Sequence, residues 1–194
     1  MDLEYVVWES KEEPNCCSLD EFLNVEKQYR LTDGVPMLVD FPSDASFTMD
    51  PDFPTDMVLV DNLINTDGLV IVSQKLKEFL AGENLQEVEF LPVTIINHKG
   101  RPVPDPYFIV HPINHVECLD LEESEAEFDL IDTDAIDSVE QIALDDSKVD
   151  SAREFFRPAP FCDVALISKR LAQAIDDAGF TGVRWIELTD YPEE

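Results

Sequence analysis

Hydrophobic and polar residues recur along the chain in patterns that predict short strands and capped helices. Residues 3–8 alternate between two faces, which is typical of a strand. Residues 18–29 begin with a serine suited to an N-cap and carry acidic residues in the first turn, so they predict a helix. A short strand is expected at residues 36–41. Residues 42–56 are rich in Pro, Asp and Ser and predict a connecting loop.

One pattern occurs twice, at residues 70–90 and at 165–185, and its register holds without a gap. Each copy has a short apolar segment, a serine, a helix with one apolar stripe, and a strand. Ser73 and Ser168 are the predicted N-caps, because a serine oxygen accepts a backbone N–H of the first helical turn. The repetition has two interpretations: an ancient duplication, or the features that any two capped helices share.

Four residues near the ends of these two predicted helices carry specific expectations. Gly82 and Gly179 lie where a residue in the left-handed conformation often ends a helix. Lys75 and Arg170 occupy the second helical position, where the positive end of the helix dipole disfavours a cation. Pairing with nearby carboxylates is the structural explanation for these two cations, and holding a partner is the alternative.

The remaining patterns predict further strands and set the fold class. Several strands with two or three separate helices indicate an α+β protein with a mainly antiparallel sheet. We expect residues 1–50 to form an N-terminal segment that packs on a main domain at residues 51–194. The further strands are expected at residues 87–97 and 107–110, antiparallel to each other across a turn at 97–100, and at residues 116–119, 139–144 and 182–188.

The net charge excludes more classes of function than the rest of the composition does. The chain has 43 Asp and Glu against 13 Lys and Arg, a formal net charge of −30. A phosphate backbone or an anionic membrane surface would be repelled, so nucleic acid and membrane are not expected partners. No apolar run is long enough to span a bilayer, and the first residues do not form a signal peptide, so we expect a cytoplasmic protein.

The negative charge is unevenly distributed. Residues 31–74 contain eight Asp and no Lys or Arg, and residues 102–147 contain fourteen carboxylates and no Lys or Arg. The densest part is residues 120–137. Three interpretations stay open: a solvated acidic loop that aids solubility, an adaptation to a high-salt cytoplasm, or a surface that recognises a cationic partner. Crowded like charges destabilise the compact state, and a basic partner would relieve that repulsion.

Two groups of residues invite a metal interpretation and do not support it. His111 and His115 lie near Cys118, but Pro112 opposes a helix there, and on a strand the histidines would be about 13 Å apart. The acidic residues 132–137 resemble part of a calcium loop but lack its glycine and its closing glutamate. We therefore predict neither a metal nor another cofactor.

Signatures of catalysis are missing as well. The chain has no nucleophile elbow, phosphate-binding loop or dinucleotide motif, and none of its cysteines forms a CxxC pair. Cys118 and Cys162 lie in apolar contexts typical of buried thiols. Carboxylates are so numerous that nominating a catalytic pair would be uninformative. No catalytic residue is predicted, and we expect the protein not to be an enzyme.

Three groups of apolar and turn residues resemble a known family: residues 70–80 with 88–93, residues 107–112 with 116–120 and Ser124, and residues 167–183. Together they are similar to the immunity protein 11-type family of bacterial polymorphic toxin systems, over residues 50–190. The resemblance implies a cytosolic protein encoded beside a secreted toxin, such as a type VI effector, which protects its producer by binding that toxin. It implies no catalytic residues.

Charge and resemblance together favour an inhibitor that covers a basic toxin, most simply a nuclease, through an acidic surface. An enzyme that reverses toxin damage, or a secretion adaptor or chaperone for the effector, is the alternative. The candidate partner-binding residues are Asp120, Glu122, Glu123, Glu125, Glu127, Asp129, Asp132 and Asp134.

Overall fold

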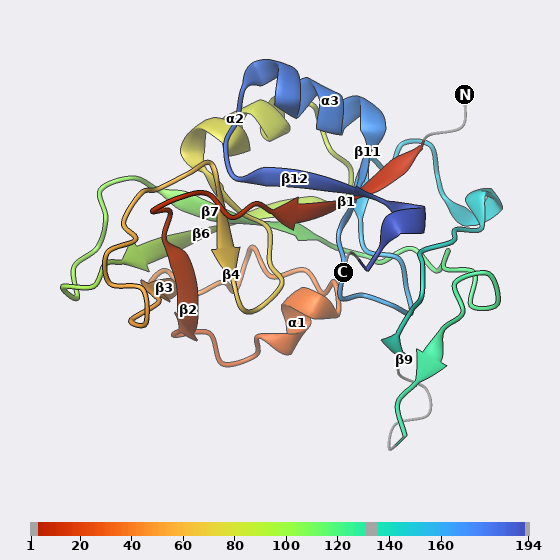
Figure 1. Ribbon diagram of the computed structural model, residues 1–194, viewed down its shortest axis with the longest axis horizontal. Coiled ribbons are helices and arrows are strands. Elements are labelled where there is room, and N and C mark those ends of the chain that lie inside the picture. Colours follow the sequence, from red (N-terminus) through yellow and green to blue (C-terminus); the bar gives the residue numbers. More distant parts are fainter. Residues whose placement is uncertain (1–3, 131–135, 193–194) are drawn as a thin grey trace.

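The computed structural model describes residues 4–130 and 136–192, and it shows a closed barrel beside an open sheet (Figure 1). Helices α2 and α3 lie together on one side, and a small hairpin projects from the body away from them. The strands are β1 (Tyr5–Ser10), β2 (Ser18–Leu23), β3 (Ser46–Met49), β4 (Asn62–Asn65), β5 (Ile71–Ser73), β6 (Val88–Ile96), β7 (Tyr107–Pro112), β8 (Glu127–Phe128), β9 (Ile136–Ser138), β10 (Phe155–Phe156), β11 (Leu166–Ser168) and β12 (Val183–Glu187). The helices are α1 (Tyr29–Thr32), α2 (Gln74–Gly82) and α3 (Lys169–Ala178), with 3-10 turns η1 (Asp146–Lys148) and η2 (Leu188–Asp190).

The barrel closes in the order β2-β3-β6-β7-β5-β4, and the open sheet has the order β10-β11-β1-β12. Neighbouring strands are antiparallel except β2 with β4 and β3 with β6. The first fifty residues contribute to both sheets, because β1 lies inside the open sheet while β2 and β3 belong to the barrel. The sequence-based prediction of an α+β fold with mainly antiparallel sheet is confirmed.

The repeated sequence pattern corresponds to two units with the same topology. In the first, β5 and β6 are joined through α2, and β7 lies between them, antiparallel to both. In the second, β11 and β12 are joined through α3, and β1 lies between them, antiparallel to both. The registers also agree: Ser73 lies opposite Tyr107, and Ser168 lies opposite Tyr5. The middle strand follows its unit in the first case and comes from the distant N-terminal segment in the second.

Three of the four predictions for the ends of these two helices are confirmed. Ser73 and Ser168 are N-caps, as predicted, and Gly179 ends α3 in the left-handed conformation with a φ of 75°. Gly82 differs, because it is the last residue of α2 and the following residue, Glu83, stays in the right-handed region. A left-handed cap at Gly82 is therefore a wrong prediction.

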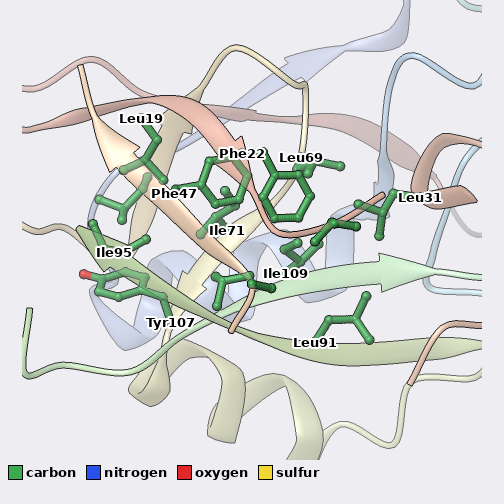
Figure 2. Packing of buried hydrophobic residues seen from close by; sticks show 14 of the residues in the cluster. Leu19, Phe22, Leu31, Phe47, Leu69, Ile71, Leu91, Ile95, Tyr107 and Ile109 are labelled. Atoms are coloured by element: carbon green, nitrogen blue, oxygen red, sulfur yellow. The ribbon is translucent and has the colours of Figure 1, made fainter. Parts of the chain in front are cut away.

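The core has three parts, and Figure 2 shows the one inside the barrel. There Phe22 from β2 stacks on Phe47 from β3, with ring centroids 4.2 Å apart and planes 1° from parallel. A second cluster fills the space between the two units and their helices, where Leu76 and Leu80 of α2 meet Leu171 of α3. The third lies against the other face of the open sheet and includes Tyr5, Val7, Cys118, Val139, Ile142 and Phe156.

The helix expected at residues 18–29 is wrong, because residues 18–23 form strand β2 and only Tyr29–Thr32 are helical. The misleading signals were Ser18, which has the character of an N-cap, and the acidic residues that follow it. Leu19 and Phe22, three residues apart, are both buried. The structure buries both with a strand irregularity, since the register of β2 against β3 shifts between these two residues. A bulge of this kind lets two residues of opposite parity point to one side.

Two neighbouring predictions are also wrong. Residues 36–41 form a turn rather than a strand, and the N–H groups of Met37 and Leu38 donate to the Glu89 carboxylate at 2.7 and 3.0 Å. The expected loop at 42–56 contains β3.

Most later predictions are closer to the structure. The strands expected at 87–97, 107–110 and 182–188 correspond to β6, β7 and β12, and β6 and β7 are antiparallel. Residues 116–119 and 139–144 form no complete strands. They meet in a single bridge between Leu119 and Leu144.

The two cations in the first helical turns differ in their partners. The Arg170 Nε donates to Glu154 at 2.7 Å and its Nη2 donates to Glu83 at 2.9 Å, so this residue joins α3 to the end of α2. Within the part of the chain that the structure describes, Lys75 forms no ion pair. The structural explanation therefore holds for Arg170. None of the described helices is long and apolar enough to cross a bilayer.

Candidate functional site

The described part of the acidic stretch singled out in the sequence forms an arm that projects from the body (Figure 1). We define the acidic arm as residues 120–130 and 136–140, in which β8 and β9 pair as a two-stranded antiparallel sheet. The predicted contacts Asp132 and Asp134 lie outside the described residues. A two-stranded hairpin has no third strand to cover it, so its side chains face solvent unless the body reaches them.

The base of the acidic arm is fixed by Ser124, which is fully buried in an otherwise exposed stretch. Its hydroxyl accepts the Ala143 N–H at 3.0 Å and lies 3.3 Å from the Ala143 carbonyl oxygen, to which it donates. The Ser124 carbonyl oxygen accepts the N–H of Glu140 at 3.1 Å. The Gln141 side chain donates to the Glu123 carbonyl oxygen at 2.8 Å. These bonds hold the start of the arm against residues 140–143.

Asp120 has a structural role in the turn that begins the arm. Its carboxylate accepts the backbone N–H groups of Glu122 and Glu123 at 3.1 and 3.0 Å. Its backbone N–H donates to the Ala143 carbonyl oxygen at 2.9 Å. An aspartate that binds the backbone two and three residues on stabilises a turn. Asp120 therefore shapes the arm, whatever a partner does.

The other described acidic candidates differ in exposure. Glu122, Glu123, Glu125 and Glu127 are exposed, whereas Asp129 is half-buried and interacts within the chain. Because residues 102–147 contain no Lys or Arg, the four exposed glutamates have no cation close to them in sequence. Like charges so close in sequence repel one another, and a cationic surface placed against them would remove that cost.

The histidines and cysteines are arranged differently from the sequence-based zinc interpretation. The His111 ring nitrogen bonds to the Val35 carbonyl oxygen at 2.9 Å, and Cys118 is buried in the third core cluster. His115 instead meets Cys162, with 3.0 Å between Nδ1 and Sγ. Sequence reasoning treated Cys162 only as a buried thiol. It lies 47 positions after His115, so no local signal in the sequence indicates this contact.

A cysteine and a histidine at this distance have the geometry of a nucleophile with its base, but their electrostatics are unsuitable. Burial raises the pKa of the Cys162 thiol to about 11. Burial, with help from the Arg157 cation, lowers the pKa of His115 to about 4. At neutral pH both groups are therefore uncharged, whereas a reactive cysteine needs its thiolate form. The arrangement joins two segments of the chain without activating the thiol.

Arg157 completes this buried cluster and supports a structural role. It is 2% exposed, and its two terminal nitrogens donate to the carbonyl oxygens of Cys162 and Gly68, the second at 2.9 Å. Gly34 lies against the ring of His115. A Cβ placed on Gly34 would lie 2.4 Å from the imidazole, and its φ of 63° also favours glycine. Four distant segments thus pack tightly here. Among the described residues, no three His, Cys, Asp or Glu side chains are arranged to hold a metal ion.

Comparisons with known proteins identify the family to which this chain belongs. No curated protein matches this sequence. A family model described as "Immunity protein family (Imm11)" matches residues 9–190. The match begins well before residue 50, where the sequence resemblance was expected to start, and it includes β2, β3 and the last two residues of β1. Because nearly all of the described elements lie within the match, the chain belongs to the Imm11 immunity protein family.

Proposed function

We propose that this protein neutralises a cognate toxin in the cytoplasm of the producing cell by binding it through the acidic arm. The observation that supports this proposal is the combination of an Imm11 family match with a projecting, one-signed surface. Glu122, Glu123, Glu125 and Glu127 are among its exposed carboxylates. A surface of this kind suits a partner with Lys and Arg at its binding site.

Electrostatic attraction would give the fast association with the toxin that an inhibitor needs. With a net charge of −30, the protein attracts a basic partner over distances of about one Debye length, roughly 8 Å at physiological salt. Such steering raises association rate constants from a neutral 10⁵–10⁶ M⁻¹s⁻¹ toward about 10⁸ M⁻¹s⁻¹ or more. Fast capture limits the time for which free toxin acts.

A nuclease is the toxin class that best fits the arm. Enzymes that cleave nucleic acid bind a row of phosphates with cationic side chains. A row of exposed glutamates on a projecting element presents a comparable row of negative charge. Occupying the toxin's cleft would exclude the substrate, and this mode of inhibition requires one copy of inhibitor for each toxin molecule.

The test uses the toxin domain encoded next to this protein. Replacing Glu122, Glu123, Glu125 and Glu127 by Lys should lower the association rate constant at least tenfold and weaken protection of cells, with the fold retained. The matched control reverses four exposed carboxylates outside the arm, and it should keep most of the association rate because only the total charge changes. The control positions are Glu21, Glu26, Asp44 and Asp52.

Titration separates this proposal from the enzyme alternative. Toxin activity should fall linearly with added protein and reach zero near one equivalent. Full protection at far below one equivalent would indicate an enzyme that reverses the damage. Binding that leaves the toxin fully active would indicate an adaptor or chaperone. An arm variant that binds as tightly as the wild type would place the interface elsewhere on the molecule.

A further inference from the structure

The acidic arm also carries an apolar strip. Phe128 of β8 lies opposite Ile136 of β9, so their side chains share one face of the hairpin. On this face, Ala126 at the base and Ile136 opposite Phe128 pack against the third core cluster. Farther along the chain the core no longer covers this face. Phe128 is 46% exposed, and Leu130, two residues on, is 96% exposed. The apolar strip therefore starts at the core and continues into solvent.

The acidic and apolar residues of the arm alternate along β8. The register shifts between Glu127 and Phe128, but the extra residue, Asp137, lies in β9, so these two neighbours in β8 still point to opposite faces. One face of the hairpin is thus apolar at Phe128, while the other presents Glu127. At the base of the arm, Glu122, Glu123 and Glu125 are exposed as well. A partner that covers the apolar strip would therefore be surrounded by carboxylates.

The charge decides which partner fits. A second copy of this chain would bring another net charge of −30 against the arm, and an anionic membrane would be repelled in the same way. A surface with an apolar depression bordered by Lys and Arg satisfies both features of the arm. A few residues buried in well-packed pockets carry most of an interface's binding energy, and an aromatic or aliphatic side chain can be such an anchor.

We infer that Phe128 and Leu130 are the apolar anchors of the toxin interface and that they insert into an apolar depression bordered by cations on the cognate toxin. This inference rests on the proposed function. The two kinds of residue have separate tasks. The glutamates set the association rate, because charge acts at long range. The anchors set the dissociation rate, because apolar burial acts only in contact.

The experiment measures both rate constants by surface plasmon resonance with the toxin domain encoded next to this protein. The double variant Phe128→Ser with Leu130→Ser should dissociate at least tenfold faster, with its association rate constant and salt dependence within about twofold of wild type. The four-lysine variant of the glutamates should show the reverse. The matched control is Phe53→Ser with Val39→Ser, since these residues are 53% and 96% exposed and lie outside the arm. It should change neither rate.

Four outcomes would overturn the inference, and they are distinguishable. If the double serine variant dissociates like the wild type while the lysine variant loses binding, the anchors are wrong and the proposed function stands. If neither arm variant changes a rate, the toxin binds elsewhere. If the wild type does not bind the toxin, the proposed function fails as well. A wild-type dimer in sedimentation velocity that Phe128→Ser abolishes would show that a second copy covers the strip.

Discussion

Ser73 and Ser168 cap the two main helices in the same way, each accepting the backbone N–H three residues further on. The distances are 3.3 Å to Leu76 and 3.2 Å to Leu171. Ser73 differs in one respect, because its hydroxyl also donates to Asp61 at 2.7 Å. The two units of the fold therefore begin their helices with the same device, and one of them adds a bond to the neighbouring β4 segment.

Removing either cap should destabilise the protein by a similar amount. Ser73→Ala and Ser168→Ala should each lower the free energy of unfolding by about 1 kcal/mol, because one N–H of the first turn loses its acceptor. Urea denaturation measures the change. Ser73→Thr is the control, since threonine keeps the accepting oxygen. Equal losses for the threonine and alanine variants at position 73 would show that the cap is not the cause.

Gly182 should be far less tolerant of substitution than Gly100, which also has a positive φ. A Cβ at this position would lie 2.3 Å from the Asn62 carbonyl oxygen, and its φ is 76°. We expect Gly182→Ala to lower the free energy of unfolding by about 2–4 kcal/mol, through strain and a clash with backbone that cannot move freely. The control is Gly100→Ala, with a φ of 68° and open space around it, which should cost about 1 kcal/mol. A similar loss for both would show that φ alone decides.

Stability should fall as the pH is lowered from about 6.5 to about 4, in part because of His115. Its pKa is about 4 in the folded protein and 6.5 in the reference state, so the unfolded chain takes up the proton first. Stability due to the neutral form is complete above pH 6.5 and is lost as the pH falls through 4, at up to about 1.4 kcal/mol per pH unit. His111, whose pKa burial also lowers, acts in the same direction.

Protonating the carboxylates also changes stability in this pH range, because it relieves repulsion in this acidic chain. The contribution of His115 to the pH dependence is therefore measured as the difference between the wild type and a variant that lacks this histidine. His115→Gln should flatten the dependence of unfolding free energy on pH between 4 and 6.5 relative to wild type, whatever its effect at neutral pH. Urea denaturation at several pH values gives both curves. Parallel curves for the two proteins would refute the assignment to His115.

Salt should stabilise the protein. A net charge of −30 repels itself, and raising NaCl from about 20 mM to about 0.5 M shortens the Debye length from roughly 20 Å to roughly 4 Å. The melting temperature should rise by several degrees in differential scanning calorimetry. The variant with Lys at Glu21, Glu26, Asp44 and Asp52 should show a smaller rise, because it starts from less negative charge. A flat or falling melting temperature would mean that repulsion is not a significant cost.

Cys162 should be dispensable for protection. Because burial keeps its thiol protonated and its neighbour His115 neutral, Cys162→Ser should retain toxin neutralisation and lose only about 1 kcal/mol of stability. Cell survival during toxin expression measures protection. Cys118→Ser, in the apolar third cluster, is the comparison and should cost more stability. Loss of protection by a stably folded Cys162→Ser would support thiol chemistry and the enzyme alternative.

Local signals predicted the two helices and their neighbouring strands well. The serine caps, the apolar stripes at Leu76 and Leu171 and the alternation through β6 and β7 are all encoded within a few residues of one another. They agree with the structure because local preference and tertiary packing favour the same element there. Residues 18–23 are the opposite case: the serine and acidic residues that predicted a helix were overridden by pairing with β3, and the bulge between Leu19 and Phe22 leaves no mark in the sequence.

The candidate site was only partly predictable. The run of carboxylates marked the acidic arm, because charge is visible in any sequence. The burial of Ser124, the role of Asp120 in the turn and the exposure of Phe128 depend on how the hairpin meets the body, which the sequence alone does not show. The contact between His115 and Cys162 was missed for the same reason, since it joins segments distant in the chain.

The position of β1 inside the open sheet has a consequence for how the protein is made. This strand is synthesised before the other strands of the open sheet, and its partners β11 and β12 follow only at residues 166–187. At about 5–20 residues per second, β1 waits roughly ten to thirty seconds with an apolar stretch uncovered. The open sheet can therefore assemble only after β11 and β12 have left the ribosome. A nascent chain that already contains every barrel strand still lacks this second sheet, so folding of the barrel alone does not complete the protein.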